Sequence, residues 1–244
     1  FIGEFSMTRI AIDAMGGDFA PAAIVDGAVW AAIDYNVPIE LVGKEDAIKA
    51  ELERISKKGI NSNRGGYYTH RLKVDLSTLD IKITNAEEVI EMGEAVGQAI
   101  RKKRKSSIVL AVDAVAKGSS DAVVAAGSTG AAMASSLFGL GRLPGIERPA
   151  IALTLPTIKR PFLLLDAGAN SSCTPEMLYQ FALMGTTFVK NVYGYENPKV
   201  GVLNIGEEAG KGNELVQKTY KMLEENQDGL NFIGNVEGKE IFKG

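Results

Sequence analysis

The sequence is poor in the residues that build cross-links and metal centres. Its 244 residues include one cysteine, Cys173, and one histidine, His70. A lone cysteine excludes an intramolecular disulfide and a cysteine-rich metal site, and it fits a reducing compartment. Since zinc centres need several nitrogen and sulfur ligands, a His/Cys metal site is excluded as well.

Long apolar runs and a strong net charge are also absent. Apolar runs such as Ala122–Ala126 are the size of a strand, far short of the ~18 apolar residues of a membrane span. The 27 Lys and Arg residues nearly balance 30 Asp and Glu residues, for a net charge of −3. Because no overall basic field can hold a polyanion, we expect no nucleic-acid partner.

Length and composition are those of an ordinary globular protein. Hydrophobic residues make up 45% of the chain, which excludes a disordered or fibrous protein. The length predicts one large domain or two small ones. The opening Phe1–Ser6 has no basic and apolar regions of a signal peptide, and we interpret it as a cloning remnant ahead of a natural start at Met7.

Short apolar runs ending in Gly, Asp or Asn alternate with Ala-rich or amphipathic stretches. The apolar runs predict strands at Arg9–Asp13, Ile39–Val42, Ile81–Thr84, Ala122–Ala126, Ala150–Leu155, Phe162–Asp166, Lys199–Asn204 and Leu230–Ile233. The other stretches predict helices at Pro21–Tyr35, Glu45–Lys57, Ala95–Arg104, Val109–Lys117, Gly130–Leu140, Pro175–Val192 and Gly212–Asn226. Several strands are apolar throughout, as in a parallel sheet covered on both faces. The pattern predicts an α/β fold, a doubly wound three-layer α/β/α sandwich with a mostly parallel sheet.

Two segments interrupt this alternation. Lys58–Lys73 has no period, contains a Gly-Gly pair and predicts an irregular surface excursion. Arg101–Lys105, with the sequence RKKRK, falls at the end of a predicted helix. Its cations either complement the negative end of the helix dipole or dock an acidic partner, and both interpretations stay open.

Polar and glycine-rich turns follow the predicted strands at the edge where α/β sheets bind ligands. The turns are DAMGGD at Asp13–Asp18, GSTG at Gly127–Gly130, DAGAN at Asp166–Asn170, NIGEE at Asn204–Glu208 with Lys211–Asn213 beyond, and GNVE at Gly234–Glu237. GSTG opens directly into a predicted helix, whose free amides and positive dipole end favour an anion. Any one of these glycines is also compatible with a simple turn, but together they predict a small, oxygen-rich ligand.

Several common chemistries lack their motifs. DAMGGD does not have the GxGxxG spacing of a dinucleotide site, and no Walker loop GxxxxGK[ST] occurs. No GxSxG elbow is present, and His70 lies in the irregular excursion rather than at a strand end. Cys173 follows DAGAN but has no imidazole base, so packing is the favoured interpretation. We expect chemistry without a protein nucleophile, a cofactor or a metal.

Six motifs in order resemble one family. DAMGGD followed by Ala20-Pro21, AAGSTGA, GRLPGIERPAIA, LLLDAGAN, LNIGEEAGKGNE and NFIGNVEG are similar to those of the PlsX-type phosphate acyltransferases of bacterial phospholipid synthesis. The resemblance implies conversion of acyl-[acyl carrier protein] and inorganic phosphate into acyl phosphate and free carrier protein. It also implies a fold similar to isocitrate dehydrogenases and phosphotransacetylases, usually as a homodimer.

The chain departs from that family in three places. Phe19 stands where the family usually has histidine, so a catalytic role of that histidine has no counterpart here. The excursion Lys58–Lys73 aligns with nothing in the family. Family members also continue with a DGFxGN motif and a C-terminal helical region. We therefore expect residues 7–244 to form a single α/β acyltransferase domain without that region. We also expect a cytoplasmic protein, in which peripheral membrane association would depend on the C-terminal region.

Phosphate is already nucleophilic and a thiolate leaves readily, so positioning and charge stabilisation carry the expected rate. We expect the hydroxyls and amides of Ser128 and Thr129 to hold phosphate, Lys211 to supply a cation, and three asparagines to orient phosphate or the thioester: Asn170, Asn204 and Asn235. Further substrate-binding candidates are Gly16, Gly17, Asp18, Gly127, Gly130, Gly168 and Gly206. Asp13, Asp18 and Asp166 would repel phosphate, so we expect them to hold donors in place, with proton transfer to the thiolate as the alternative.

Two other functions remain open. A metal-dependent dehydrogenase of related fold would use Asp13, Asp18 and Asp166 as ligands for a divalent cation. An inert scaffold would bind acyl carrier protein through Arg101, Lys102, Lys103, Arg104 and Lys105. A second basic cluster, formed by Arg142, Arg148, Lys159 and Arg160, is the alternative dock.

Overall fold

The computed structural model describes residues 8–62, 70–226 and 229–243. The chain divides after Gly141 into two compact units, and each is described by itself. The predicted single domain over residues 7–244 stays a prediction, and the interpreted remnant Phe1–Ser6 lies outside the described residues.

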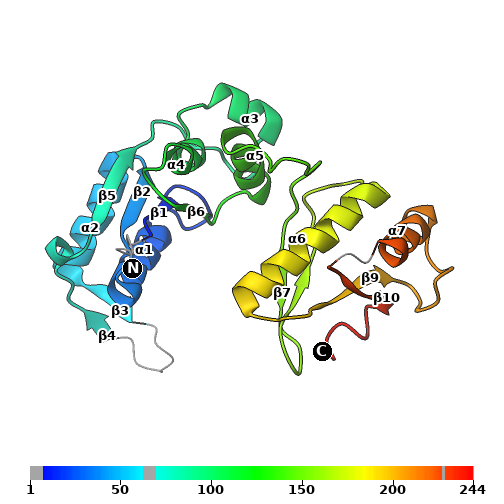
Figure 1. The fold of residues 1–244 in the computed structure, drawn as a ribbon. Helices are drawn as coiled ribbons and strands as arrows, with labels where there is room; N and C mark the ends of the chain where they lie inside the picture. The colour runs from blue at the N-terminus through cyan, green and yellow to red at the C-terminus, as the bar shows by residue number, and fades with distance from the viewer. Residues whose placement is uncertain (1–7, 63–69, 227–228, 244) are drawn as a thin grey trace, which may run out of the picture. The chain divides into compact units, whose positions relative to one another are not determined.

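A parallel sheet forms the centre of the first unit (Figure 1). Its strands are β1 (Ile10–Asp13), β2 (Ile39–Gly43), β5 (Ile81–Asn85) and β6 (Ala122–Ala125), in the order β5-β2-β1-β6. Every neighbouring pair is parallel, and Asp13 at the end of β1 lies opposite Val42 and Ala125. The carboxyl ends of these strands therefore meet at one edge, as the sequence predicted.

Alternate residues of the strands feed two cores on opposite faces of this sheet. Ile12 and Leu41 pack with helices α1 (Ala22–Tyr35) and α2 (Glu45–Lys58) on one face. Ala11 and Val42 pack against α4 (Ser107–Ala116) on the other. Because side chains alternate along a strand, this pattern requires a helical layer on each face, which confirms the three-layer α/β/α prediction.

Two short helices extend the α4 layer. The helix α3 (Val96–Lys102) and the helix α5 (Thr129–Gly139) pack around Ile100, Val112 and Ala131. Both helices were predicted from the sequence, and each predicted boundary lies within two residues of the boundary in the structure.

The predicted irregular excursion contains regular structure. Strands β3 (Ile60–Ser62) and β4 (His70–Leu72) pair antiparallel, and the 3₁₀ turn Leu76–Thr78 follows. Ile60 is fully buried in the core under α1 and α2. The prediction of a purely irregular segment was therefore wrong for its two ends, and residues 63–69 lie outside the described residues.

The described part of the second unit contains strand pairs covered by helices (Figure 1). Strands β7 (Leu153–Leu155) and β8 (Phe162–Leu164) form an antiparallel hairpin, and helix α6 (Pro175–Tyr193) follows. Strands β9 (Lys199–Asn204) and β10 (Asn231–Glu237) pair in parallel, and helix α7 (Glu214–Glu225) packs on them.

Three sequence predictions need correction in this unit. Ala150–Leu155 is a strand only from Leu153 onward. Phe162–Asp166 is not a strand to its end, because β8 stops at Leu164 and Asp166 begins the turn. Gly234–Glu237 is not a turn after a strand but the second half of β10, which carries a bulge between Phe232 and Asn235. The last of these errors comes from glycine and asparagine, which the sequence marks as turn residues and which bulges also accept.

Among the described helices, none has the length and apolar character needed to cross a bilayer.

Candidate functional site

The turns that follow β1 and β6 contact each other through their backbones at the carboxyl edge of the sheet in the first unit. A Cβ on Gly16 would lie 2.7 Å from Asp13 Oδ2 and 3.0 Å from the Gly127 nitrogen, and a Cβ on Gly127 would lie 3.0 Å from the Gly16 Cα. Gly17 has φ of +102°, and its Cβ would lie 2.9 Å from the Ala126 carbonyl oxygen. The DAMGGD and GSTG turns therefore approach each other at a distance that only glycine allows.

Asp13 lies beneath this contact. Its side chain is 4% exposed, and Oδ1 accepts a hydrogen bond of 3.2 Å from the Met15 amide. Burial raises the pKa of the Asp13 carboxyl, although hydrogen bonds from Ser107, Met15 and Gly16 oppose that effect. Asp13 thus shapes the glycine turn from inside, whereas Asp18 at the end of the same turn is exposed.

The GSTG turn forms the start of α5. Ser128 is the N-cap, and its hydroxyl accepts a 3.3 Å hydrogen bond from the Ala131 amide. Thr129, the first helical residue, is exposed. A Cβ on Gly130 would lie 3.1 Å from the Val96 side chain of α3. Since the first amides of a helix have no carbonyl partner within it, this exposed start suits an oxygen-rich anion.

In the second unit, Asp166 organises the DAGAN turn. Its oxygens accept hydrogen bonds from the amides of Ile151, Ala169 and Asn170 at 2.7, 3.1 and 2.8 Å, and from Asn170 Nδ2 at 3.0 Å. Partial burial acts to raise the pKa of Asp166, but these hydrogen bonds outweigh it and hold the pKa below its ordinary value. Asn170 Nδ2 also donates to the Pro149 carbonyl at 2.9 Å, so this amide braces the turn, while Gly168 on it is exposed with φ of +112°.

Cys173, just beyond this turn, is not set up as a nucleophile. Burial raises the pKa of its thiol, and the nearby charge of Asp166 raises it further. A thiol in this setting is protonated at neutral pH.

Asparagine and glutamine side chains hold the loop between β9 and α7. Asn204 Nδ2 donates to the Lys211 carbonyl at 3.0 Å, and Asn235 Nδ2 donates to the Glu208 carbonyl at 2.8 Å. Gln217 Nε2 donates to the carbonyls of Gly210 and Gly212 at 2.8 and 3.1 Å. These three amides fix the backbone of residues 204–213, which leaves the Lys211 side chain exposed on a held loop.

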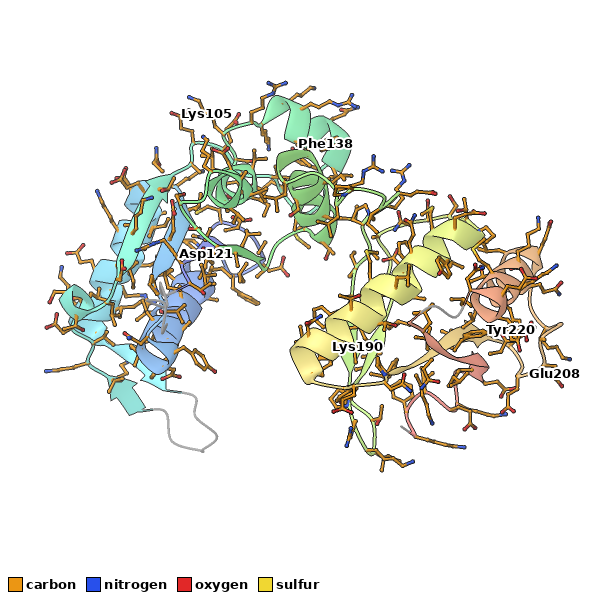
Figure 2. The ribbon with its side chains drawn as sticks, in the orientation of Figure 1. Lys105, Asp121, Phe138, Lys190, Glu208 and Tyr220 are labelled. Atoms are coloured by element: carbon orange, nitrogen blue, oxygen red, sulfur yellow. The ribbon has the colours of Figure 1, made fainter. Side chains whose placement is uncertain are left out.

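Gly206 and Asn235 are both buried at this loop. Gly206 is buried, and a Cβ there would lie 3.1 Å from Glu208 Oε2 and from the Lys211 side chain. Asn235 is 8% exposed, and its Oδ1 has no hydrogen-bond partner among the described residues. Figure 2 shows Glu208 on the outer part of the loop. The buried Asn235 therefore supports the loop through its amide nitrogen, which donates to the Glu208 carbonyl.

The basic run at Arg101–Lys105 spans the end of α3 and the turn before α4. Lys103 Nζ pairs with Glu94 and donates to the Val89 carbonyl at 2.7 Å, and Lys105 Nζ pairs with Glu87 at 3.3 Å. Arg101, Lys102 and Arg104 are exposed. Figure 2 shows Lys105 at the outer surface of this unit. Lys103 and Lys105 are thus held in ion pairs, and Arg101, Lys102 and Arg104 form a smaller basic surface.

Ser107 and Gln217 were not predicted from the sequence. Ser107 is buried at the start of α4, which packs on the strand that ends at Asp13, and Gln217 of α7 donates to the loop before that helix. The only signal for Gln217 was its position after an N-cap asparagine, Asn213, which accepts from the Val216 amide at 3.1 Å. Nothing local marks Ser107, because the strand that α4 packs on lies far away in the sequence.

Comparison with known families identifies the chain. The family model described as "Fatty acid synthesis protein" matches residues 8–244. The chain belongs to this family. Within the fatty acid synthesis protein family, it is 48% identical over 236 residues to "Phosphate acyltransferase" from Pelotomaculum thermopropionicum, covering 97% of this chain and 63% of the relative. It is 50% identical over 236 residues to "Phosphate acyltransferase" from Heliobacterium modesticaldum, covering 97% and 64%. The chain thus spans less than two thirds of the length of these family members.

Solved structures share the fold of the family. "EutD phosphotransacetylase from Staphylococcus aureus" matches with a TM-score of 0.63 at 17% identity, covering 95% of this chain and 69% of that one. 4-Hydroxythreonine-4-phosphate dehydrogenase from Klebsiella pneumoniae matches with a TM-score of 0.51 at 16% identity, covering 96% and 77%. These likenesses confirm the predicted fold class.

Proposed function

We propose that the whole protein transfers an acyl group from acyl-[acyl carrier protein] to inorganic phosphate, giving acyl phosphate that feeds glycerol-3-phosphate acylation in phospholipid synthesis. The observation that carries this proposal is the exposed start of α5, where Ser128 and Thr129 follow a glycine contact at the carboxyl edge of the sheet. Membership of the fatty acid synthesis protein family and relatives named phosphate acyltransferase support the same activity.

In the proposed reaction a phosphate oxygen attacks the thioester carbonyl carbon. A carbon–oxygen bond forms, the carbon–sulfur bond breaks, and the carrier thiol leaves as a thiolate that is then protonated. The α5 start holds phosphate through amides and the Thr129 hydroxyl, which positions a nucleophile that is already ionised. The raised pKa of Cys173 supports a reaction without an acyl-enzyme intermediate.

The residues of the second unit supply charge and rigidity in this proposal. Lys211 stands exposed on a loop held by three amide side chains, so it offers a positioned cation for developing negative charge. Asn170, Asn204 and Asn235 use their amide donors to brace turns, which supports a positioning role for them. Asp13 and Asp166 likewise hold backbone donors rather than face phosphate.

Carrier-protein docking, dimerisation and location complete the proposal. The exposed cations Arg101, Lys102 and Arg104 form the dock for the acidic carrier protein. They lie just before α4, which packs on β1, the strand that ends at Asp13, so a carrier docked there lies on the same unit as the DAMGGD and GSTG turns. We further propose a cytoplasmic homodimer, with peripheral membrane association through a C-terminal region like that of the longer relatives.

The experiment that tests the activity uses protein extended to the full length of its relatives. Acyl phosphate should form from acyl-[acyl carrier protein] and phosphate without added nucleotide, nicotinamide or metal. Strict dependence on one of these additions would contradict the proposal.

Replacing Thr129 with valine tests the anion site. The change keeps the shape and removes a hydroxyl donor, and a hydrogen bond to a charged ligand is worth ~1.5–3 kcal/mol, so phosphate affinity should fall about 10- to 150-fold. The apparent KM for phosphate measures this loss. Cys173→Ser is the control and should keep nearly full turnover. Unchanged phosphate dependence in Thr129→Val would place the anion elsewhere.

A further inference from the structure

The tip of the β7–β8 hairpin, residues 156–161 with the sequence PTIKRP, presents an apolar side chain beside two cations. Ile158 is 86% exposed, more than any other large hydrophobic side chain of the described residues. Lys159 and Arg160, the next two residues, are exposed as well. Figure 1 shows the tip of this hairpin beyond the end of α6. The tip therefore offers apolar area and positive charge together at a projecting turn.

The backbone donors of the tip find their acceptors within the protein. Thr157 Oγ1 accepts hydrogen bonds from the amides of Lys159 and Arg160, each at 3.1 Å, and donates to the Arg160 carbonyl at 2.7 Å. The Ile158 amide donates to the Phe242 carbonyl at 3.2 Å. A proline at each end of the tip has no amide hydrogen. Because these donors do not depend on water, the turn can enter a water-poor layer at small cost.

Aromatic rings and a further cation lie behind the tip. The Arg160 guanidinium lies over the Tyr195 ring, 5.3 Å from its centre, and the Tyr193 ring lies 5.9 Å from that of Tyr195. The Tyr193 hydroxyl shares a 2.6 Å hydrogen bond with Thr154 of β7, which ties the rings to the hairpin. Lys190 is exposed in the last turn of α6 (Figure 2). Tyrosine is enriched at the boundary between water and hydrocarbon, and lysine and arginine are attracted to anionic head groups.

We propose that the tip of the β7–β8 hairpin binds the surface of a membrane that contains anionic lipids. Ile158 enters the head-group region, and Lys159 and Arg160 contact lipid phosphates. This inference goes beyond the proposed function and does not depend on acyl transfer. It also places a membrane contact within this chain, apart from the C-terminal region of the longer relatives.

The charges of the chain favour an anionic surface only at a local patch. The net charge of −3 gives no overall attraction to such a surface. At the tip, Lys159, Arg160 and Lys190 outnumber Glu196, the exposed carboxylate that follows Tyr195. An acidic protein would be attracted by the same cations, but it would need a groove for the isoleucine. A bilayer takes the isoleucine and the cations at once.

The test measures sedimentation of the 244-residue chain with vesicles, so that the C-terminal region of the longer relatives is not in the sample. Vesicles of phosphatidylglycerol in phosphatidylcholine are compared with phosphatidylcholine alone. We expect binding to the anionic vesicles only, and weaker binding at high salt. Ile158→Asp should weaken binding by about tenfold or more, and Arg160→Glu by about 5- to 30-fold. Arg160→Lys keeps the charge and should bind like the unmodified chain.

Phe138→Asp is the matched control, because it removes an apolar side chain that is 69% exposed on α5 of the other unit (Figure 2). Binding should not respond to it. Unchanged binding in Ile158→Asp, or an equal loss in Phe138→Asp, would overturn the inference. If Ile158→Asp does not fold, Ile158→Ser replaces it under the same criteria. If Arg160→Glu weakens binding of acyl-[acyl carrier protein] but not of vesicles, the tip docks a protein and the inference fails. Sedimentation needs no acyl substrate, so a failed acyl transfer assay would leave its result unchanged.

Discussion

At the scale of single residues, Glu40 shows how a charge is kept inside the sheet. It lies on β2 between two other strands, and its side chain is 2% exposed. Its oxygens accept hydrogen bonds from Thr84 at 2.6 Å, Ser120 at 3.0 Å and Lys82 at 3.1 Å. Burial acts to raise the pKa of Glu40, but these donors outweigh it and lower the pKa below its ordinary value of 4.5.

Glu40→Gln should therefore destabilise the protein in a pH-dependent way. A depressed carboxyl pKa contributes stability that is present above pH 4.5 and is lost as the pH falls through the folded-state value. We expect the variant to lose about 2 kcal/mol in the free energy of unfolding at pH 7, with a smaller difference below pH 4.5. Urea unfolding at several pH values measures this. Glu53→Gln, on the exposed face of α2, is the control and should change stability by less than about 0.5 kcal/mol.

At the residue scale, the sequence predicted where glycine-rich turns follow strands, because such turns depend on the backbone. The DAMGGD and GSTG turns lie at strand ends, and the structure brings Gly16 and Gly127 into contact, while their role in substrate binding stays a prediction. The sequence could not tell that the Asn204 and Asn235 amides face their own loop, because the direction of a side chain depends on the folded neighbours. Ser107 was invisible for the same reason.

At the scale of elements, the loop between β9 and α7 is held by amide donors from three different elements. Asn235→Asp should loosen it, because a carboxylate cannot donate to the Glu208 carbonyl and would repel it. We expect faster amide hydrogen exchange in residues 205–212, by about tenfold for a lost hydrogen bond of ~1–1.5 kcal/mol. Exchange followed by mass spectrometry measures the change.

Asn226→Asp is the matched control for that loop. Asn226 Nδ2 also donates to a backbone carbonyl, that of Met222 at 2.9 Å, but it does so at the end of α7. Exchange in residues 205–212 should not respond to it. Equal acceleration by both substitutions would show that the loop does not depend on Asn235.

Elements were predicted best where apolar runs are long and flanked by helices. The strands β1, β2, β5 and β6 were found within a residue or two, since a parallel sheet buried on both faces leaves a strong apolar signal. The β7–β8 hairpin was predicted as two strands, but their antiparallel pairing was not apparent. The short strands β3 and β4 were missed, because three-residue strands carry too little periodicity.

At the scale of the whole molecule, the net charge of −3 makes docking of an acidic carrier depend on a local surface. Reversal of Lys103 is a poor test, since it would break the pair with Glu94 inside the unit. Lys102→Glu changes an exposed cation instead. We expect about 3- to 5-fold weaker binding of acyl-[acyl carrier protein] at low salt and a shallower salt dependence, with unchanged affinity for phosphate.

Lys58→Glu supplies the control for that charge reversal. It makes the same change in net charge at an exposed position on the far end of α2. If both variants bind the carrier protein equally, the three exposed cations of the basic run are not the dock. If Arg160→Glu alone weakens binding, the second basic cluster takes that role.

The bulge in β10 lies directly before Asn235, the residue of this strand that supports the loop. Between the pairs Phe232–Val200 and Asn235–Val202, β10 uses one more residue than β9. That extra residue puts Asn235 on the same face as Asn204, whose neighbour across the pair is Glu237. A one-residue deletion between Phe232 and Asn235 would remove the bulge and leave Asn235 opposite Val202 in a regular ladder, so the loop would keep this support. Homologous chains that are one residue shorter here should therefore still place an amide side chain beneath the loop.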